Sequence, residues 1–345
     1  MKKVTMIVDL QYGSTGKGLI AGWWAETNRP DVVVTCNMPN AGHTYIDQKG
    51  QKMVHKVLPN GIVSPALQYV MIGPGAVFSL DRLAIELTNA YDLGYVKPEQ
   101  LIIHPDAMVL KEEHAKTEQQ TLSGISSTMQ GSAAAMVEKI MRGNSVSRAG
   151  AVASLSHCPT WFTDAVVTHG RWIDIIGAAE NILAEGSQGW SLGINSGFYP
   201  YCTSRDCTPA RFLSDMALPI GMLKKVIGTA RTYPIRVGNT PDGFSGGIYP
   251  DQIEIDFKDI GQPDEYTTVT GRKRRIFTLS LQQLAEASFY CCPDEIFLNF
   301  ANYLEQPTDV ADMMADIEAT TGAPVGYIGY GPSFHDVATE WRERV

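Results

Sequence analysis

The sequence predicts an α/β fold with a largely parallel central sheet, flanking helices and long loops that bind ligands. Three observations predict it: short buried apolar runs, helical stretches between them, and polar glycine-rich segments directly after several runs. Parallel strands need crossover connections, which are usually helices, so this alternation is typical of a parallel sheet. We expect residues 1–345 to form a single domain, because no shift in composition marks a second one.

The strands are expected where apolar runs end in turn residues. These runs are residues 4–10, 32–34, 70–72, 101–103, 182–184, 295–298 and 325–328. Helical patterns follow at 19–26, 79–93 and 280–289, with Ser79 as a candidate N-cap. Residues 123–135 and 238–247 are rich in glycine and polar residues, and we expect both to be long surface loops that contact ligands.

Composition limits the function. With 44% hydrophobic and 19% charged residues the chain can bury a large core. Its 28 basic and 37 acidic residues give a net charge of −9, which argues against direct binding of a nucleic-acid backbone. No apolar run is long enough to cross a membrane, and none forms a signal peptide, so a cytoplasmic location is expected. The six cysteines contain no CxxC pair, and we expect reduced thiols.

A glycine loop follows the first strand and reads Gly13-x-x-Gly16-Lys17-Gly18. It is two residues too short for a Walker motif, so by itself it could be a turn with a surface lysine. A strand that leads through glycines into a helix start nevertheless suits a phosphate group. Backbone N–H groups converge there, the helix dipole favours anions and Lys17 adds a positive charge.

Three further segments carry polar side chains that suit a nucleotide site. Residues 40–44 contain His43, which becomes a catalytic candidate only if the fold places it beside the glycine loop. Residues 185–189 contain Gln188, whose amide could read a base edge, although a plain surface turn fits equally well. Residues 267–275 place four cations behind a hydroxyl-rich turn; they form either a solvated face or a site for a dicarboxylate or phosphate.

In this order, these segments resemble the adenylosuccinate synthetase family, whose members join aspartate to the 6-position of IMP with GTP. The resemblance rests on residues 11–18, 40–44, 125–128, 185–189, 199–204, 236–238, 270–275 and 331–332. It spans nearly the whole chain and implies the P-loop-related fold of that family, Mg²⁺ as cofactor and a homodimer. The segment between about 143 and 182 looks shorter than is usual in the family.

The resemblance also implies residue roles. Binding of the nucleoside triphosphate falls to Ser14, Thr15, Gly16, Lys17, Gly18, Gly42, His43, Thr44, Asn299, Phe300, Asn302, Gly331 and Pro332. Binding of the purine monophosphate falls to Ser14, Asn40, Ser127, Thr128, Gln188, Thr203, Val237 and Arg272, with Arg142 contributed by the second subunit. Aspartate would be held by Thr268, Thr270, Arg272 and Arg274, and Mg²⁺ by Ser14 and the carbonyl of Gly42. The catalytic set would be Lys17, Ser14 and His43, with His43 as the acid.

The first departure from the family pattern is a missing carboxylate. The usual motif reads Gly-Asp-Glu-Gly-Lys-Gly, and its aspartate takes the N1 proton of IMP; here that position is Ser14. A serine hydroxyl is a poor general base at neutral pH without a partner. The sequence leaves open whether the proton goes to ordered water or to the departing phosphoryl oxygens, and whether Ser14 orients the base or the magnesium shell.

The second departure concerns the phosphate donor. Where the family reads Thr-Lys-x-Asp to recognise guanine, residues 299–302 read Asn-Phe-Ala-Asn. An aspartate accepts from guanine N1–H and its 2-amino group, whereas an asparagine amide has the donor and acceptor that the edge of adenine requires. Phe300 can stack on the base for about 1–3 kcal/mol. The donor is therefore expected to be ATP or dATP.

The third departure concerns the acceptor. Ser14 is smaller than aspartate and leaves room for the 2-amino group of guanine. Together with residues 299–302 it makes the chain resemble the phage branch of the family, the 2-aminoadenylosuccinate synthetases, which act on dGMP to supply diaminopurine deoxynucleotide for phage DNA. The chain is thus expected to be an ATP-dependent ligase of L-aspartate and dGMP, acting in the host cytoplasm.

Two alternatives stay open at this point. One is an ordinary adenylosuccinate synthetase that acts on IMP. The other is a nucleotide-binding regulatory protein that has lost catalysis together with its aspartate. The presence of His43 and of Arg272 and Arg274 argues against the second, because a protein that only binds nucleotides has no use for an acid and an aspartate site.

Overall fold

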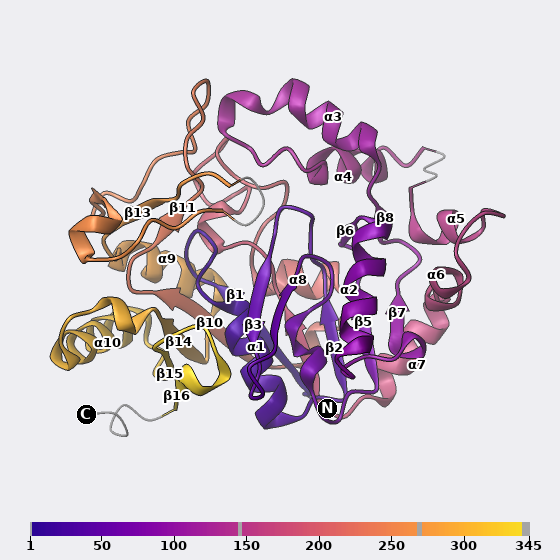
Figure 1. Ribbon diagram of the computed structural model, residues 1–345, viewed down its shortest axis with the longest axis horizontal. Helices are drawn as coiled ribbons and strands as arrows, with labels where there is room; N and C mark the ends of the chain where they lie inside the picture. The colour runs from indigo at the N-terminus through magenta and orange to yellow at the C-terminus, as the bar shows by residue number, and fades with distance from the viewer. Residues whose placement is uncertain (1, 144–146, 268–270, 340–345) are drawn as a thin grey trace.

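The architecture is built on one nine-stranded sheet (Figure 1). We describe it from a computed structural model that covers residues 2–143, 147–267 and 271–339. The strand order is β16-β15-β14-β10-β1-β9-β2-β5-β7, and only the β15–β16 pair is antiparallel. The strands are β1 (Val4–Asp9), β2 (Val32–Thr35), β5 (Tyr69–Ile72), β7 (Leu101–Ile103), β9 (Ile182–Glu185), β10 (Leu223–Arg231), β14 (Glu295–Asn299), β15 (Val325–Gly329) and β16 (Val337–Ala338).

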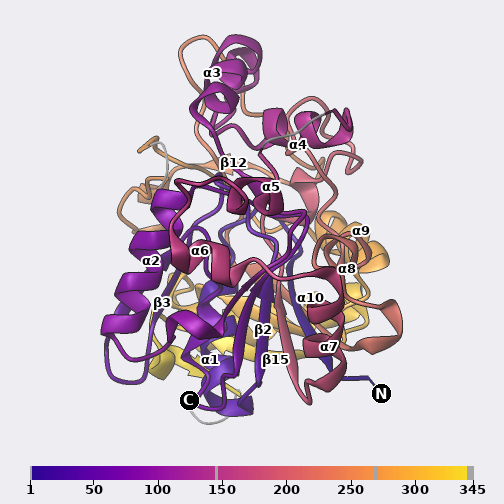
Figure 2. The ribbon, with the colours of Figure 1, turned by 90° about the vertical axis from the view of Figure 1, so that its right-hand side faces the viewer.

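Helices cover both faces of this sheet, as Figure 2 shows. Strand β1 is buried throughout, with Met6 in the core on one face and Ile7 in the core on the other. The first core is completed by α7, α8, α9 and α10, and the second by α1, α2 and α6. Their bounds, with those of the remaining helices, are α1 (Lys17–Asn28), α2 (Leu80–Asp92), α3 (Glu112–Thr121), α4 (Ser132–Ile140), α5 (Ala149–Ala153), α6 (Thr160–Ala165), α7 (His169–Ala178), α8 (Pro209–Asp215), α9 (Leu281–Cys291) and α10 (Pro307–Thr321).

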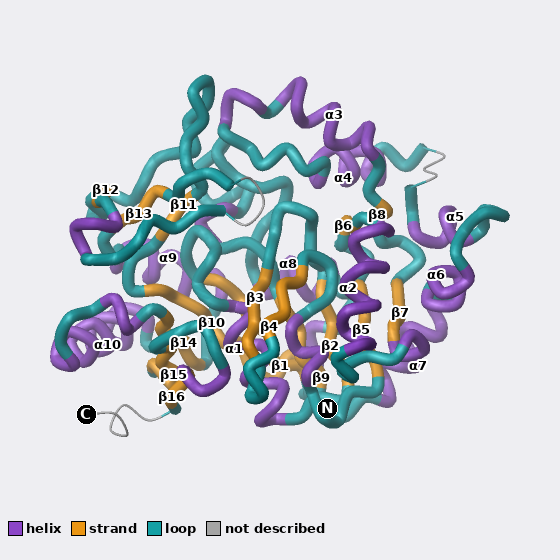
Figure 3. Tube along the Cα trace, in the orientation of Figure 1, coloured by secondary structure: helices purple, strands orange, loops and turns teal. Residues whose placement is uncertain are grey.

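Three small sheets lie outside the central one (Figure 3). They are the β3–β4 hairpin, the β6–β8 pair and the three-stranded sheet β11-β13-β12. Their strands are β3 (His43–Ile46), β4 (Lys52–His55), β6 (Val77–Phe78), β8 (Met108–Val109), β11 (Ile235–Arg236), β12 (Glu254–Ile255) and β13 (Arg275–Phe277). The helices α3 and α4 stand apart from the main sheet, beyond the carboxyl ends of its strands (Figure 1).

The predicted α/β fold with a largely parallel sheet is confirmed. Every predicted strand is present, and Ser79 caps α2 by accepting from the backbone N–H of Arg82 at 3.3 Å. Sequence analysis missed β10, the long strand beside β1, and its prediction of a loop at 123–135 is wrong in part, because α4 begins at Ser132. The single domain and the shortened segment at 143–182 stay predictions. No helix in the described part of the chain is both long and apolar enough to cross a membrane.

Candidate active site

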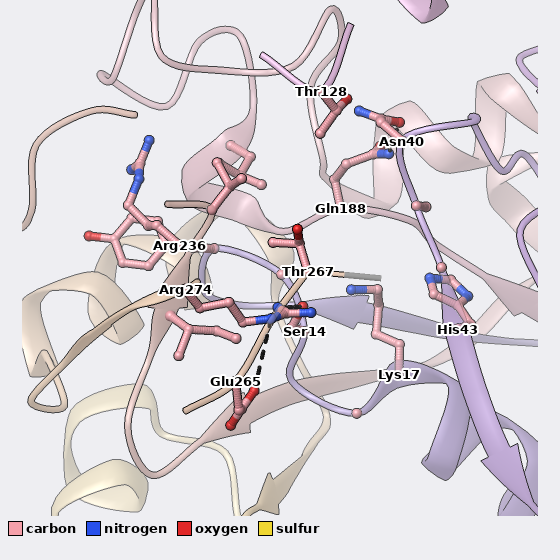
Figure 4. A pocket seen from close by; sticks show the side chains of 18 of the residues that line it. Ser14, Lys17, Asn40, His43, Thr128, Gln188, Arg236, Glu265, Thr267 and Arg274 are labelled. Atoms are coloured by element: carbon pink, nitrogen blue, oxygen red, sulfur yellow. Dashed lines mark hydrogen bonds and ion pairs between the residues drawn. The ribbon is translucent and has the colours of Figure 1, made fainter. Parts of the chain in front are cut away.

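A pocket of about 600 Å³ opens at the carboxyl ends of the parallel strands. Loops that follow β1, β2, β9, β10, β14 and β15 all contribute to its lining. In parallel α/β sheets this edge is where ligands bind, and the volume lies within the usual range for small-molecule sites. Figure 4 shows side chains from segments far apart in the sequence converging on this space.

The glycine loop, residues 13–18, joins β1 to α1 and has little room for side chains. Gly16 has φ +92°, and a Cβ placed there would lie 2.1 Å from Nδ2 of Asn299. A Cβ on Gly18 would lie 2.3 Å from Nδ2 of Asn60. The loop therefore exposes backbone at the start of α1, where unpaired N–H groups and the helix dipole favour an anion.

Lys17 and His43 line the same side of the pocket (Figure 4), and each has a buried carboxylate behind it. Lys17 Nζ lies 2.8 Å from Asp9 Oδ2. His43 Nδ1 lies 3.7 Å from Glu185 Oε2, and within the described residues it has no hydrogen-bond partner. The condition set for His43, that the fold place it beside the glycine loop, is met. Both groups can present positive charge or a hydrogen-bond donor to a phosphate.

The amides of Gln188 and Asn40 are held by a buried arginine. Gln188 Nε2 donates to Asn40 Oδ1 at 2.8 Å, while Gln188 Oε1 accepts from Arg205 Nη2 at 3.3 Å. Arg205 is 1% exposed and pairs with Asp215 at 3.0 Å. The oxygen of Gln188 is thus used within the protein, so any reading of a base edge by this residue would depend on its nitrogen.

The arginines of the pocket have different roles. Arg236 points away from the centre of the pocket (Figure 4) and donates to the backbone carbonyls of Ser245 and Tyr201, which fixes loops rather than a ligand. Arg272 donates to the carbonyls of Ser126 and Ser127, both at 3.0 Å. Sequence analysis assigned a binding role to Arg272, whereas it included Arg236 only in the segment 236–238 that resembles the family.

Arg274 reaches across the pocket to the loop after β1. Its Nη1 donates to Ser14 Oγ at 2.5 Å, and its Nε lies 4.0 Å from Glu265 Oε2. A ligand with a carboxylate could replace Ser14 as the partner of this guanidinium, because a charged acceptor binds it more strongly than a neutral hydroxyl. Arg274 as a ligand of aspartate stays a prediction.

Glu265 is the one acidic side chain that lines the pocket among the described residues. It accepts from Arg231 Nη2 at 2.6 Å and from the Tyr303 hydroxyl at 3.0 Å. Burial alone would raise the pKa of this carboxyl, but Arg231 and Arg274 outweigh it and hold the pKa below its ordinary value. A carboxylate paired with two arginines is a weaker proton acceptor than a free one.

Residues 299–302, which we call the base loop, adjoin the glycine loop. Asn299 Nδ2 donates to the carbonyl of Thr15 at 3.3 Å, and Asn299 Oδ1 accepts from the backbone N–H of Phe300. The ring of Phe300 lies 3.8 Å from the guanidinium of Arg231. Asn302 is exposed and lines the pocket, so its amide is the one available to a base.

Ser14, Gln188 and Phe300 share an unusual backbone. Their φ values of +57°, +61° and +61° fall in the left-handed region, which side-chain-bearing residues seldom adopt. Such conformations cost free energy and persist where the surrounding fold enforces them, often at functional sites. All three line the pocket.

Most predicted site residues lie together. Those that line the pocket are Ser14, Gly16, Lys17, Gly18, Asn40, Gly42, His43, Thr44, Ser127, Thr128, Gln188, Thr203, Val237, Arg274, Asn299, Phe300, Asn302, Gly331 and Pro332. Thr15 is buried beneath the loop, and Arg272 acts from behind the lining. Arg142 is exposed at the end of α4, away from this pocket. Thr268 and Thr270 lie outside the described residues.

A family model settles the relationship. The model described as adenylosuccinate synthetase matches residues 6–169 and 164–306. The chain belongs to the adenylosuccinate synthetase family. The predicted family is confirmed, and with it the class of carbon–nitrogen ligases.

Relatives within the family point to its phage branch. The chain is 51% identical to the N6-succino-2-amino-2'-deoxyadenylate synthase of Vibrio phage phiVC8, with 100% of both chains covered. It is 41% identical to the enzyme of that name from Cyanophage S-2L, with 98% of this chain and 92% of the relative covered. The predicted resemblance to the phage branch is thereby confirmed.

Solved structures of the family agree. A Cyanophage S-2L succinoaminodeoxyadenylate synthetase, bound to dGMP and to dATP as an energy donor, matches with a TM-score of 0.89 and 40% identity over 98% of this chain and 95% of that one. The fully ligated adenylosuccinate synthetase from Plasmodium falciparum matches with a TM-score of 0.79 and 19% identity, over 98% of this chain and 100% of that one. The second match shows the shared fold.

Proposed function

We propose that the chain is a ligase that joins L-aspartate to the 6-position of dGMP at the expense of ATP or dATP. The γ-phosphoryl group passes from the donor to O6 of dGMP as the N1 proton leaves. The aspartate amine then attacks C6 and phosphate departs. The products are 2-amino-2'-deoxyadenylosuccinate, phosphate and ADP or dADP, and they belong to diaminopurine deoxynucleotide synthesis for phage DNA.

One observation carries this proposal. In a chain 51% identical to a phage enzyme named for this product, Ser14 replaces the family's catalytic aspartate and Asn302 replaces its guanine-reading aspartate. Both residues line the same pocket, one at the glycine loop and one at the base loop. The cyanophage relative bound to dGMP and dATP supports the same choice of acceptor and donor. An IMP-specific enzyme and an inactive regulatory protein are not favoured by these findings.

Lys17 and His43 are the proposed catalytic groups. They lie on the wall formed by the glycine loop and residues 40–44, and each is backed by a buried carboxylate. Groups fixed in advance around a transferring phosphoryl group stabilise its charge without reorganisation, which is the main source of acceleration in such reactions. His43 is the acid in this proposal, and Arg274 holds a carboxylate of aspartate.

Magnesium belongs to the proposal in a restricted form. Gly42 is exposed in the pocket lining, so its carbonyl oxygen is accessible to Mg²⁺. Mg²⁺ prefers oxygen ligands, and several of them are usually phosphate oxygens and water molecules. Ser14, the other predicted ligand, accepts from Arg274 at 2.5 Å, and its hydroxyl oxygen is available to the ion once that guanidinium pairs with a substrate carboxylate. When bound, the ion neutralises charge on the transferring phosphoryl group.

We also propose a homodimer in which Arg142 reaches the partner's active site. Arg142 is exposed just after α4, and the neighbouring side chains of Val137, Ile140 and Met141 are 57%, 65% and 73% exposed. A cluster of exposed apolar side chains commonly marks a protein contact. Gel filtration tests this: the wild type is expected to elute as a dimer, and an Ile140→Glu variant as a monomer.

An ADP-release assay tests the activity itself. With ATP and aspartate, dGMP is expected to support turnover, and IMP much less; with dGMP fixed, ATP or dATP should be preferred to GTP. A preference for IMP with GTP would contradict the proposal in favour of the ordinary enzyme. A rise in melting temperature with ATP and dGMP, but no aspartate-dependent ADP release, would identify a binding protein. The proposed place of action is the host cytoplasm.

A further inference from the structure

A buried carboxylate lies directly beneath the glycine loop. Asp9, the last residue of β1, is 1% exposed. Its Oδ1 accepts from the backbone N–H groups of Gln11 at 2.8 Å and Gly13 at 3.2 Å. Its Oδ2 accepts from Thr15 Oγ1 at 2.5 Å and from Lys17 Nζ at 2.8 Å. The carboxylate of Asp9 thus connects the start of the glycine loop to Thr15 and Lys17 further along it.

The surroundings hold Asp9 in this position. Thr15 Oγ1 also contacts Thr229 Oγ1 on the adjacent strand β10, at 2.5 Å. On the other side, a Cβ added to Gly189 would lie 2.5 Å from Asp9 Oδ1, so the loop after β9 packs closely against the carboxylate. A charge in such a place needs a partner, because an unpaired buried carboxylate is costly. Lys17, which is 5% exposed, is that partner.

Asp9 does not line the pocket, whereas Lys17 does. Lysine has a flexible four-carbon side chain, so a defined position for its ammonium group needs an anchor. Asp9 takes one of the three N–H donors of Lys17 and holds the group at the wall beside the start of α1. Among the described residues, Asp9 is the one partner of this ammonium group, so its other two N–H donors can serve the pocket.

We infer that Asp9 is a positioning residue that fixes the ammonium group of Lys17 where the donor phosphates bind. It acts through Lys17 and does not contact substrate. This role goes beyond the residues predicted from the sequence and rests on the proposed function, because it requires that Lys17 serve the nucleoside triphosphate. Its effect should therefore concentrate on the donor and on phosphoryl transfer.

An Asp9→Asn variant tests the role kinetically. The amide keeps the size of the side chain and can still accept from the loop, but it has no charge for Lys17. We expect kcat/KM for ATP to fall about 100-fold, while KM for dGMP and for aspartate changes less than about threefold. Thr229→Val is the matched control, because it removes a hydroxyl from the same buried cluster; it should lower Tm and leave KM for ATP unchanged. If Asp9 were purely structural, Asp9→Asn would behave like Thr229→Val: Tm would fall and KM for ATP would stay unchanged.

A double variant tests whether Asp9 acts through Lys17. If it does, Lys17→Met combined with Asp9→Asn should have the same kcat/KM for ATP as Lys17→Met alone. Losses that multiply in the double variant would overturn the inference. Each rate is compared with that of the wild type under saturating dGMP and aspartate.

Thermal unfolding gives a readout that does not depend on activity. Lys17→Met leaves Asp9 buried without its counter-ion and should lower Tm, and adding Asp9→Asn should raise Tm again by removing the unpaired charge. Failure of the second substitution to restore Tm would overturn the ion pair as described. If the wild type released no aspartate-dependent ADP, the proposed function would fail, while this measurement would still decide the pairing of Asp9 with Lys17.

Discussion

The two walls of the pocket hold their nitrogen-bearing side chains differently. On the phosphate wall, residues 13–18 and 40–44, Lys17 and His43 each have a buried carboxylate behind them. On the arginine wall, residues 236–238, 265–267 and 271–274, Arg274 reaches across the cavity to the hydroxyl of Ser14. A cation anchored from behind, as Lys17 is by Asp9, keeps its place when a ligand enters, whereas one that donates across a cavity can exchange its partner for the ligand. In the proposed function, the first wall therefore serves phosphoryl transfer and the second wall serves capture of a substrate.

The largest effect should come from removing His43 from the phosphate wall. We expect His43→Ala to lower kcat by about 10²- to 10³-fold, because one preorganised donor to a transferring phosphoryl group is lost. KM for aspartate should change little, since the arginine wall is untouched. The measurement is steady-state ADP release, with the exposed His157→Ala as the control. Turnover equal to that of the wild type would remove His43 from the mechanism.

A negative charge at position 14 should tie Arg274 to the phosphate wall and thereby weaken the use of both dGMP and aspartate. In Ser14→Asp the new carboxylate would pair with Arg274, which already lies 2.5 Å from the hydroxyl. We expect kcat/KM for dGMP to fall about 10- to 100-fold and KM for aspartate to rise. The asparagine of Ser14→Asn has nearly the size of aspartate but no charge, so this variant separates the effect of size from the effect of charge. Unchanged dGMP kinetics in Ser14→Asp would show that Ser14 does not shape the choice of acceptor.

A smaller and more selective effect is expected at the base loop. Asn302→Asp restores the acceptor pair that matches guanine, so kcat/KM should fall about tenfold with ATP and rise with GTP. KM for dGMP should stay the same, because Asn302 lies at the donor end of the pocket. Competition between ATP and GTP measures the change. Equal loss with both donors would mean that Asn302 supports the loop and does not read the base.

The smallest effect concerns His104, which lies away from both walls beside Asp106 and His169. Burial lowers its pKa from 6.5 to about 4. The unfolded chain therefore takes up this proton first as the pH falls, so the contribution to stability is complete above pH 6.5 and is lost toward pH 4. His104→Gln should reduce that slope, by at most about 1.4 kcal/mol per pH unit, without changing turnover at pH 7.5. Urea unfolding between pH 5 and 7 measures it, and an unaltered slope would contradict the assignment.

The sequence predicts most of the sheet because strands buried on both faces appear as continuous apolar runs. Strand β10 escapes this rule. It ends in small and polar residues, among them Gly228, where a Cβ would lie 2.6 Å from Leu10 Cδ1, and Arg231, which is buried by its pairing with Glu265. Close packing and a buried ion pair replace the apolar signal there, and both depend on residues distant in the sequence.

The residues of the candidate site also fall into two groups: those that the sequence alone can predict and those that it cannot. Lys17 and His43 can be named as candidates from the sequence because each lies in a short local motif. The carboxylates behind them cannot, because in the sequence Asp9 is only the end of a strand and Glu185 only part of a turn. Glu265 stands just before a recognised cluster of cations, yet its role depends on Arg231, 34 residues earlier in the chain. Only the fold brings these partners together.

The side chain of Asn299 lies between Gly16 of the glycine loop and Gly329 at the end of β15. A Cβ on Gly16 or on Gly329 would come within 2.1 Å of its amide. Asn299 therefore acts as a spacer that sets how far the glycine loop stands from β15, while Phe300 and Asn302 stay out of that contact. If Phe300 and Asn302 contact the donor base as proposed, substitutions at these two residues can change which nucleotide is spent without moving the glycine loop, so donor choice and catalysis can vary independently.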